Sequence, residues 1–131
     1  MAQLMDYLCD SNVIIDHLNG AHEATAFILN NSRSLGISAV TRIEVLGFAF
    51  PTPKAESAAE ELINSMVNIG ISEKIIACTI TLRKKVRIKI PDAIIASTAL
   101  CHQCLLVTRN TDDFKDVEGL KCVNPFAKSA P

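Results

Sequence analysis

Short apolar runs alternate with longer segments of helical periodicity along this chain, and this alternation restricts its fold more than any other feature. The runs Tyr7–Cys9, Leu35–Ser38 and Leu105–Val107 are too short for ordinary helices and are mostly apolar. Strands of that kind are typical of sheets buried on both faces, in which helices connect parallel neighbours. The pattern therefore predicts an α/β protein with a mainly parallel central sheet flanked by helices.

Periodicity and turn residues place the remaining elements. The sequence contains neither an internal repeat nor a linker, so we expect a single domain over residues 1–131, with the last few residues forming a flexible tail. We expect further strands at Val67–Ile71 and Leu120–Val123. The predicted helices cover Asn12–Leu18, Glu23–Leu29, Thr41–Phe48, Lys54–Met66, residues 73–86 and Asp92–Cys101.

Composition narrows the class of protein. Apolar residues make up 49% of the chain and charged residues 21%, which excludes wholesale disorder. The 13 basic side chains are balanced by 14 acidic ones, so any nucleic-acid partner requires a local basic patch. The longest segment free of charged side chains, Ala93–Thr108, is shorter than the ~20 apolar residues of a membrane span. With no basic segment at the N-terminus typical of secretion signals, we expect a cytoplasmic protein that does not enter the membrane.

The cysteines favour reduced thiols. There are five, an odd number, and they are scattered at Cys9, Cys78, Cys101, Cys104 and Cys122. Such spacing does not indicate a disulfide framework. Cys101 and Cys104 have the spacing of a zinc-binding pair, but a structural zinc site requires a second pair that this chain lacks.

Four acidic residues stand at positions where α/β proteins bind ligands. Asp10 follows the first predicted strand, Asp113 follows the strand at residues 105–107, Asp92 begins a helix and Glu44 lies within one. Ligands of parallel sheets bind beyond the carboxyl ends of the strands. Carboxylates that meet there repel one another and raise each other's pKa, and a divalent cation relieves the repulsion. Ligation by oxygen suits Mg²⁺ or Mn²⁺ better than zinc.

Each of these acids also has a structural interpretation. Asp10 is a good helix cap, Asp92 is stabilised in a first helical turn, and Asp113 suits an ordinary turn. Glu44 differs because its helical neighbours are mostly apolar, so we expect a half-buried carboxylate that needs a positive partner.

Four segments, in order, resemble the motifs of PIN-domain nucleases, and of VapC-type toxins in particular. They are Asp10–Asp16, Ser38–Gly47, Pro91–Ala99 and Leu106–Phe114. The resemblance implies a three-layer PIN-like fold and a Mg²⁺-dependent endoribonuclease, the toxin of a toxin–antitoxin pair. It further implies a homodimer, inhibited by a cognate antitoxin, that hydrolyses RNA by metal-activated water.

Carried over by position, the resemblance makes Asp10, Glu44, Asp92 and Asp113 the metal ligands and catalytic residues. Asn110 lies where some relatives carry an aspartate, so Asn110 and Asp113 are alternatives for the fourth position. The hydroxyls of Ser11 and Thr41 are candidates for orienting the ligands.

A basic cluster comes directly before Asp92. It is either a solvated helix end or a guide for RNA phosphates. The residues that we predict to bind RNA are Arg83, Lys84, Lys85, Arg87, Lys89 and Arg109. We expect most of the segments Ile43–Phe50 and Ala55–Met66 to lie in the core. The part that remains exposed is a candidate surface for the antitoxin, on which Phe48 and Phe50 would form a groove for a helix.

Two other functions share parts of this pattern. A receiver-like Mg²⁺-binding signalling domain requires an acidic pair after the first strand and a lysine after a late one, but this chain has Asp10-Ser11 and Thr108-Arg109 there. A non-catalytic PIN scaffold in a nucleic-acid complex is the second alternative, and the intact acidic set favours catalysis over it.

Overall fold

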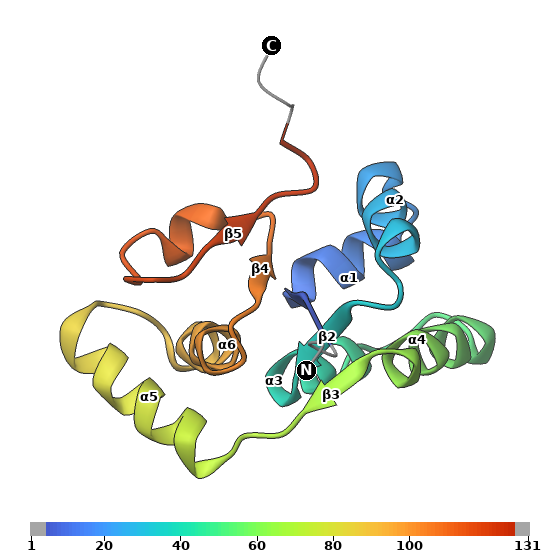
Figure 1. Ribbon diagram of the computed structural model, residues 1–131. Coiled ribbons are helices and arrows are strands. Elements are labelled where there is room, and N and C mark those ends of the chain that lie inside the picture. The colour runs from blue at the N-terminus through green and yellow to red at the C-terminus, as the bar shows by residue number, and fades with distance from the viewer. Residues whose placement is uncertain (1–4, 128–131) are drawn as a thin grey trace.

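The computed structural model describes residues 5–127, and these residues contain a parallel sheet of five strands in the order β3-β2-β1-β4-β5 (Figure 1). Every neighbouring pair is parallel, which confirms the predicted α/β class. The tail expected at the C-terminus lies outside the described residues. The strands are β1 Tyr7–Cys9, β2 Leu35–Ser38, β3 Val67–Ile69, β4 Leu105–Val107 and β5 Cys122–Val123.

Side-chain caps begin most of the helices. Asp10, Ser38, Thr52 and Ser72 each accept a hydrogen bond from a backbone N–H of the first turn, as capping residues do. No described helix is long and apolar enough to cross a membrane. The helices are α1 Ser11–Leu18, α2 His22–Asn30, α3 Ala39–Leu46, α4 Pro53–Ser65, α5 Glu73–Lys85 and α6 Ile90–Cys101, with a 3₁₀ helix η1 at Thr111–Phe114.

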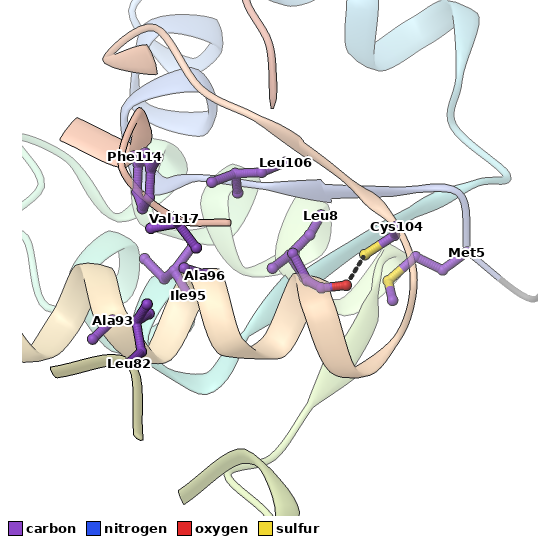
Figure 2. Packing of buried hydrophobic residues seen from close by; sticks show 11 residues of the cluster. Met5, Leu8, Leu82, Ala93, Ile95, Ala96, Cys104, Leu106, Phe114 and Val117 are labelled. Atoms are coloured by element: carbon purple, nitrogen blue, oxygen red, sulfur yellow. Dashed lines mark hydrogen bonds between the residues drawn. The ribbon is translucent and has the colours of Figure 1, made fainter. Parts of the chain in front are cut away.

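Successive residues of the central strands point to opposite faces of the sheet, and each face is covered by helices. Leu8 and Leu106 pack with α6 and with Phe114 of η1 (Figure 2). The next residues, Cys9 and Val107, pack on the other side with side chains of α1, α2 and α4. The result is a three-layer structure with an apolar cluster on either side of the sheet.

Helix α6 is the most buried helix of the fold. Its small residues Ala93, Ala96, Ser97 and Ala99 have at most 1% of their surface exposed, and small side chains let a helix approach its neighbours closely. Because α6 begins at the carboxyl edge of the sheet, this packing fixes the position of Asp92 in its first turn.

Three expectations from the sequence need correction. The strand expected at Val67–Ile71 ends at Ile69, because the chain then turns toward the Ser72 cap of α5. The last strand is Cys122–Val123, shorter than predicted. Helix η1 was not predicted at all, because four residues are too few to show a helical period.

Candidate active site

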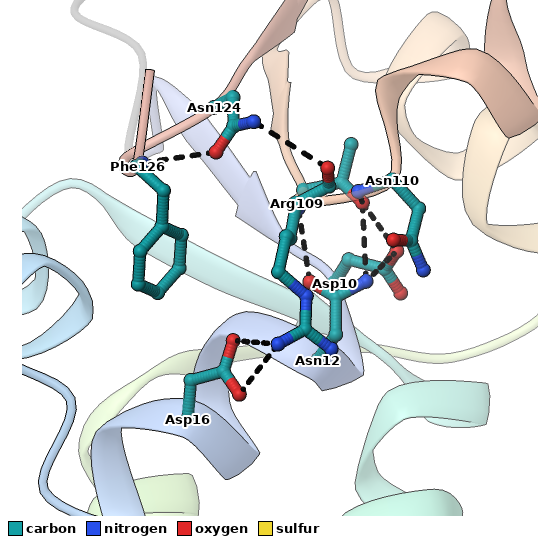
Figure 3. A network of polar contacts seen from close by, with 8 residues as sticks. Asp10, Asn12, Asp16, Arg109, Asn110, Asn124 and Phe126 are labelled. Atoms are coloured by element: carbon teal, nitrogen blue, oxygen red, sulfur yellow. Dashed lines mark hydrogen bonds and ion pairs between the residues drawn. The ribbon is translucent and has the colours of Figure 1, made fainter. Parts of the chain in front are cut away.

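Asp10 lies where β1 ends and α1 begins, and it is 6% exposed. Its Oδ1 accepts a hydrogen bond from the backbone N–H of Ser11 at 2.8 Å, so Asp10 does cap α1. Its Oδ2 accepts hydrogen bonds from Thr108 Oγ1 at 2.8 Å and from Asn12 Nδ2 at 3.2 Å (Figure 3). The carboxylate is therefore held from both oxygens by neutral donors.

Glu44 lies on α3 and is exposed, so the expectation of a half-buried carboxylate is wrong. Its Oε1 instead accepts a hydrogen bond from Ser11 Oγ at 2.5 Å. Ser11 Oγ also lies 3.4 Å from Thr41 Oγ1, so the two hydroxyls that the sequence indicated do lie beside the acids. Helical neighbours did not reveal this environment, because it is set by the packing of α1 on α3.

The other predicted acids come from α6 and η1. Asp92 is half-buried in the first turn of α6, and Asp113 is exposed on η1. Asn110 is the residue before η1; its side chain is exposed, and its backbone N–H donates to Thr108 Oγ1 at 3.1 Å.

The four carboxylates lie close enough for their charges to interact. Burial raises the pKa of Asp10, and the charges of Glu44 and Asp113 raise it further, against the hydrogen bonds described above. Burial likewise raises the pKa of Asp92, with additional increases from Asp10, Asp113 and Glu44 and a small opposing effect of Lys89. Carboxylates that destabilise one another's charge in this way favour a bound cation.

The carboxylate oxygens of these acids suit a hard cation by their chemistry. Their arrangement in the structure does not enclose one. Within residues 5–127, no three Asp, Glu, His or Cys side chains are arranged so that they could hold a metal ion as they stand. The acids offer carboxylate oxygens, which Mg²⁺ and Mn²⁺ prefer. Burial raises the pKa of the adjacent Cys9 to about 12, which leaves it an uncharged thiol and a poor ligand. The donor set fits Mg²⁺ or Mn²⁺ provided that the acids turn toward one another.

The other cysteines lie outside the acidic cluster. All five are free thiols, as predicted. Cys104 is buried, and its Sγ donates to the carbonyl oxygen of Ala99 at 3.8 Å.

Basic side chains adjoin the acidic cluster. Asp92 and Asp113 line a groove of about 540 Å³ together with Arg83, Arg87 and Lys89. A neighbouring hollow of about 420 Å³ includes Lys84 and Lys85 as well. Arg83 Nε donates to the carbonyl oxygen of Ile88 at 3.2 Å, which ties the end of α5 to the segment that leads into α6. Five of the six predicted RNA-binding residues therefore lie in or next to the groove.

Arg109, the sixth, forms an ion pair with Asp16 on α1 and does not line this groove (Figure 3). Sequence reasoning also missed Thr108, which donates to Asp10 and accepts from Asn12 and from the backbone of Asn110. The available signal was its place directly after a buried strand, where a hydroxyl faces the carboxyl edge of the sheet.

Comparison with known proteins identifies the class that this fold and acidic edge define. The family model of the PIN domain matches residues 7–120, so the chain belongs to the PIN domain family. Within that family, its fold is that of the VapC-type chains. No curated protein matches the sequence.

Several solved structures are similar over nearly the whole chain. A chain of a toxin–antitoxin complex from Klebsiella pneumoniae is 32% identical, with a TM-score of 0.81 over 94% of this chain and 100% of that one. A chain of DNA-bound VapBC from Salmonella typhimurium is 17% identical, with a TM-score of 0.82 over 92% and 98%. A chain of VapBC-1 from nontypeable Haemophilus influenzae is 24% identical, with a TM-score of 0.77 over 94% and 100%.

Proposed function

We propose that this protein is a divalent-metal-dependent endoribonuclease and the toxin of a toxin–antitoxin pair. The observation that carries the proposal is the proximity of Asp10, Glu44, Asp92 and Asp113, whose charges raise the pKa of Asp10 and Asp92, beside a groove lined by both acidic and basic side chains. In this proposal the four acids are the ligands of Mg²⁺, or of Mn²⁺ in its place. When bound, such an ion makes water a better nucleophile at neutral pH and offsets the negative charge that develops on a phosphate under attack.

The chain's own residues have three tasks in this reaction. Thr108 and Asn12 hold Asp10, and Ser11 holds Glu44, which limits how far these two carboxylates can turn. Arg83, Arg87 and Lys89 attract the RNA backbone, which the acids alone would repel. The N-terminus of α6 adds the positive end of a buried helix beside Asp92.

The proposed antitoxin site lies between the second half of α1 and the segment that follows α3. Phe48 and Phe50 line a small apolar groove of about 120 Å³ with Ile15 and Leu18. Phe48 is 55% exposed, which is unusual for so large an apolar side chain. An apolar helix of the antitoxin would cover this groove. We further propose, from the family resemblance, that the toxin is a cytoplasmic homodimer.

The test is RNA cleavage by the purified protein with Mg²⁺, with EDTA in excess, and with the Asp92→Asn variant. We expect loss of cleavage in EDTA and a decrease of more than about 100-fold in the variant, because a direct ligand contributes more than the groups that orient it. Asp116→Asn is the matched control, because Asp116 lines the same groove but is not one of the four acids. Cleavage that persists in Asp92→Asn would refute the assignment of the active site.

The same assay separates the alternatives. A non-catalytic scaffold would bind RNA without cutting it under any of these conditions. A receiver-like domain is disfavoured, because the chain belongs to the PIN domain family and lacks the acidic pair and the lysine that such a domain requires.

A further inference from the structure

Arg109 is engaged within the protein. Its Nη1 lies 3.0 Å from Asp16 Oδ2 and donates to Asp16 Oδ1 at 3.1 Å (Figure 3). The Asp16 side chain is only 15% exposed, whereas that of Arg109 is 51% exposed. Within residues 5–127, Arg109 is the cation that pairs with this mostly buried carboxylate. If Arg109 turned to an RNA phosphate, Asp16 would lose this partner.

This ion pair is the outer end of a chain of contacts that leads to Asp10. The backbone N–H of Arg109 donates to Asn12 Oδ1 at 3.0 Å. The Nδ2 group of Asn12 in turn donates to Asp10 Oδ2 and to Thr108 Oγ1, both at 3.2 Å. Arg109 is thus joined to α1 through its backbone at Asn12 and through its side chain at Asp16, one helical turn further on.

The two segments joined in this way each carry part of the acidic cluster. Helix α1 begins at Asp10, whereas the segment after β4 leads through Arg109 to Asn110 and Asp113. Asn124 Nδ2 donates to the carbonyl oxygen of Arg109 at 3.4 Å, so the chain after β5 braces the same residue. A rotation of α1 relative to this segment would change the separation of Asp10 from Asp113.

We propose that Arg109 and Asp16 are positioning residues. Their ion pair sets the distance between Asp10 and Asp113, and thereby the affinity of the site for a divalent cation. Arg109 is accordingly not an RNA contact. This inference rests on the proposed function, since it presupposes that the acids bind a cation.

The experiment is a double-mutant cycle read out by Mn²⁺ binding in calorimetry, on the full chain. We expect Arg109→Gln and Asp16→Asn each to weaken Mn²⁺ binding about 10-fold, as loss of an outer contact of a metal site does. The double variant should be no weaker than either single one, because both remove the same interaction. Binding of a fluorescein-labelled hairpin RNA in EDTA should stay within about twofold of the wild-type value in all three.

An RNA contact predicts the reverse pattern. Arg109→Gln would then weaken RNA binding and leave Mn²⁺ binding unchanged, and Asp16→Asn would affect neither; this result would overturn the inference. Arg33→Gln is the matched control, because Arg33 is exposed and precedes β2 at the opposite edge of the parallel sheet.

Two further measurements distinguish a variant that fails to fold from a failure of the proposed function. Thermal unfolding shows whether each variant is folded, and Arg109→Lys, which keeps the charge, should recover part of the lost Mn²⁺ affinity. If the wild-type protein does not bind Mn²⁺, both the proposed function and this inference fail. If wild type and variants bind Mn²⁺ equally, only the positioning role fails.

Discussion

Ser97 offers the sharpest test of how α6 holds the site. Its side chain is fully buried, and its Oγ has no hydrogen-bond partner within residues 5–127. The neighbouring Thr98 differs, because its Oγ1 donates to the carbonyl oxygen of Ile94 at 2.7 Å. A buried hydroxyl without a partner has lost its water without compensation. We therefore expect Ser97→Ala to stabilise the protein.

The size of the effect follows from three contributions. Relief of the unpaired hydroxyl contributes about 1–3 kcal/mol. Alanine is also the better helix former, by roughly half a kcal/mol. The void left by one oxygen atom, on the order of 10 Å³, costs only about 0.2 kcal/mol at the usual cost per unit of cavity volume. The net gain is about 1–3 kcal/mol, or a rise of roughly 4–12 °C in Tm for a domain of this size.

Urea titration and thermal melting of Ser97→Ala measure this gain directly. Thr98→Val is the matched comparison: it also removes a buried hydroxyl, but one that is already satisfied, so it should give no gain. Cleavage by Ser97→Ala should stay at the wild-type level, because Asp92 is untouched. Equal or lower stability of Ser97→Ala would show that the hydroxyl has a partner, such as a buried water, and that the reasoning is wrong.

Three other variants test the fold and the groove. Asp92→Asn, measured in EDTA, should raise Tm at neutral pH, because the folded protein raises the pKa of this carboxyl and so disfavours its charged form. The gain in Tm should vanish as the pH falls below about 4, where the carboxyl is protonated in the folded and the unfolded protein alike. Gly36→Ala should lower the free energy of unfolding by about 1 kcal/mol in urea, because a Cβ there would lie 3.2 Å from the carbonyl oxygen of Val67 and would displace the buried Met5 side chain. Replacing both Arg87 and Lys89 by Gln should weaken RNA binding and reduce the slope of log K against log salt by about 1.4, as expected for two lost phosphate contacts; an unchanged slope would exclude these contacts.

Much of the fold was predictable because its signals are local. The strands β1, β2 and β4 begin and end at the predicted residues, since each apolar run is bounded by polar or turn residues. The helices were predicted to within a few residues for the same reason, with caps such as Ser72 marking their starts. The short η1 could not be found, because it depends on the turn after β4 and on the burial of Phe114 in the cluster beneath it.

Only those site residues whose positions follow from the end of a strand were predictable from the sequence. The position of Asp10 follows from the end of β1, but the surroundings of Glu44 depend on Ser11, 33 residues away in the sequence. Thr108 and Asp10 are 98 residues apart, and their hydrogen bond exists only because β4 pairs with β1 in parallel register. No pattern along the chain contains such a pairing.

The placement of the basic side chains explains how Asp10 and Glu44 can lie close together in the folded protein without being neutralised. Asp10 and Glu44 are held by hydroxyl, amide and backbone donors, which orient a carboxylate without neutralising it. Arg109, which follows Thr108 at this edge of the sheet, is engaged by Asp16. An arginine paired with Asp10 would stabilise the fold, but it would also neutralise the charge that attracts a divalent cation. The ion pair therefore serves two purposes: it braces α1 against the segment after β4, and it keeps the guanidinium out of the cluster. Asp16→Asn and Arg109→Gln both remove this brace, and each should for this reason weaken cation binding by the same factor of about 10.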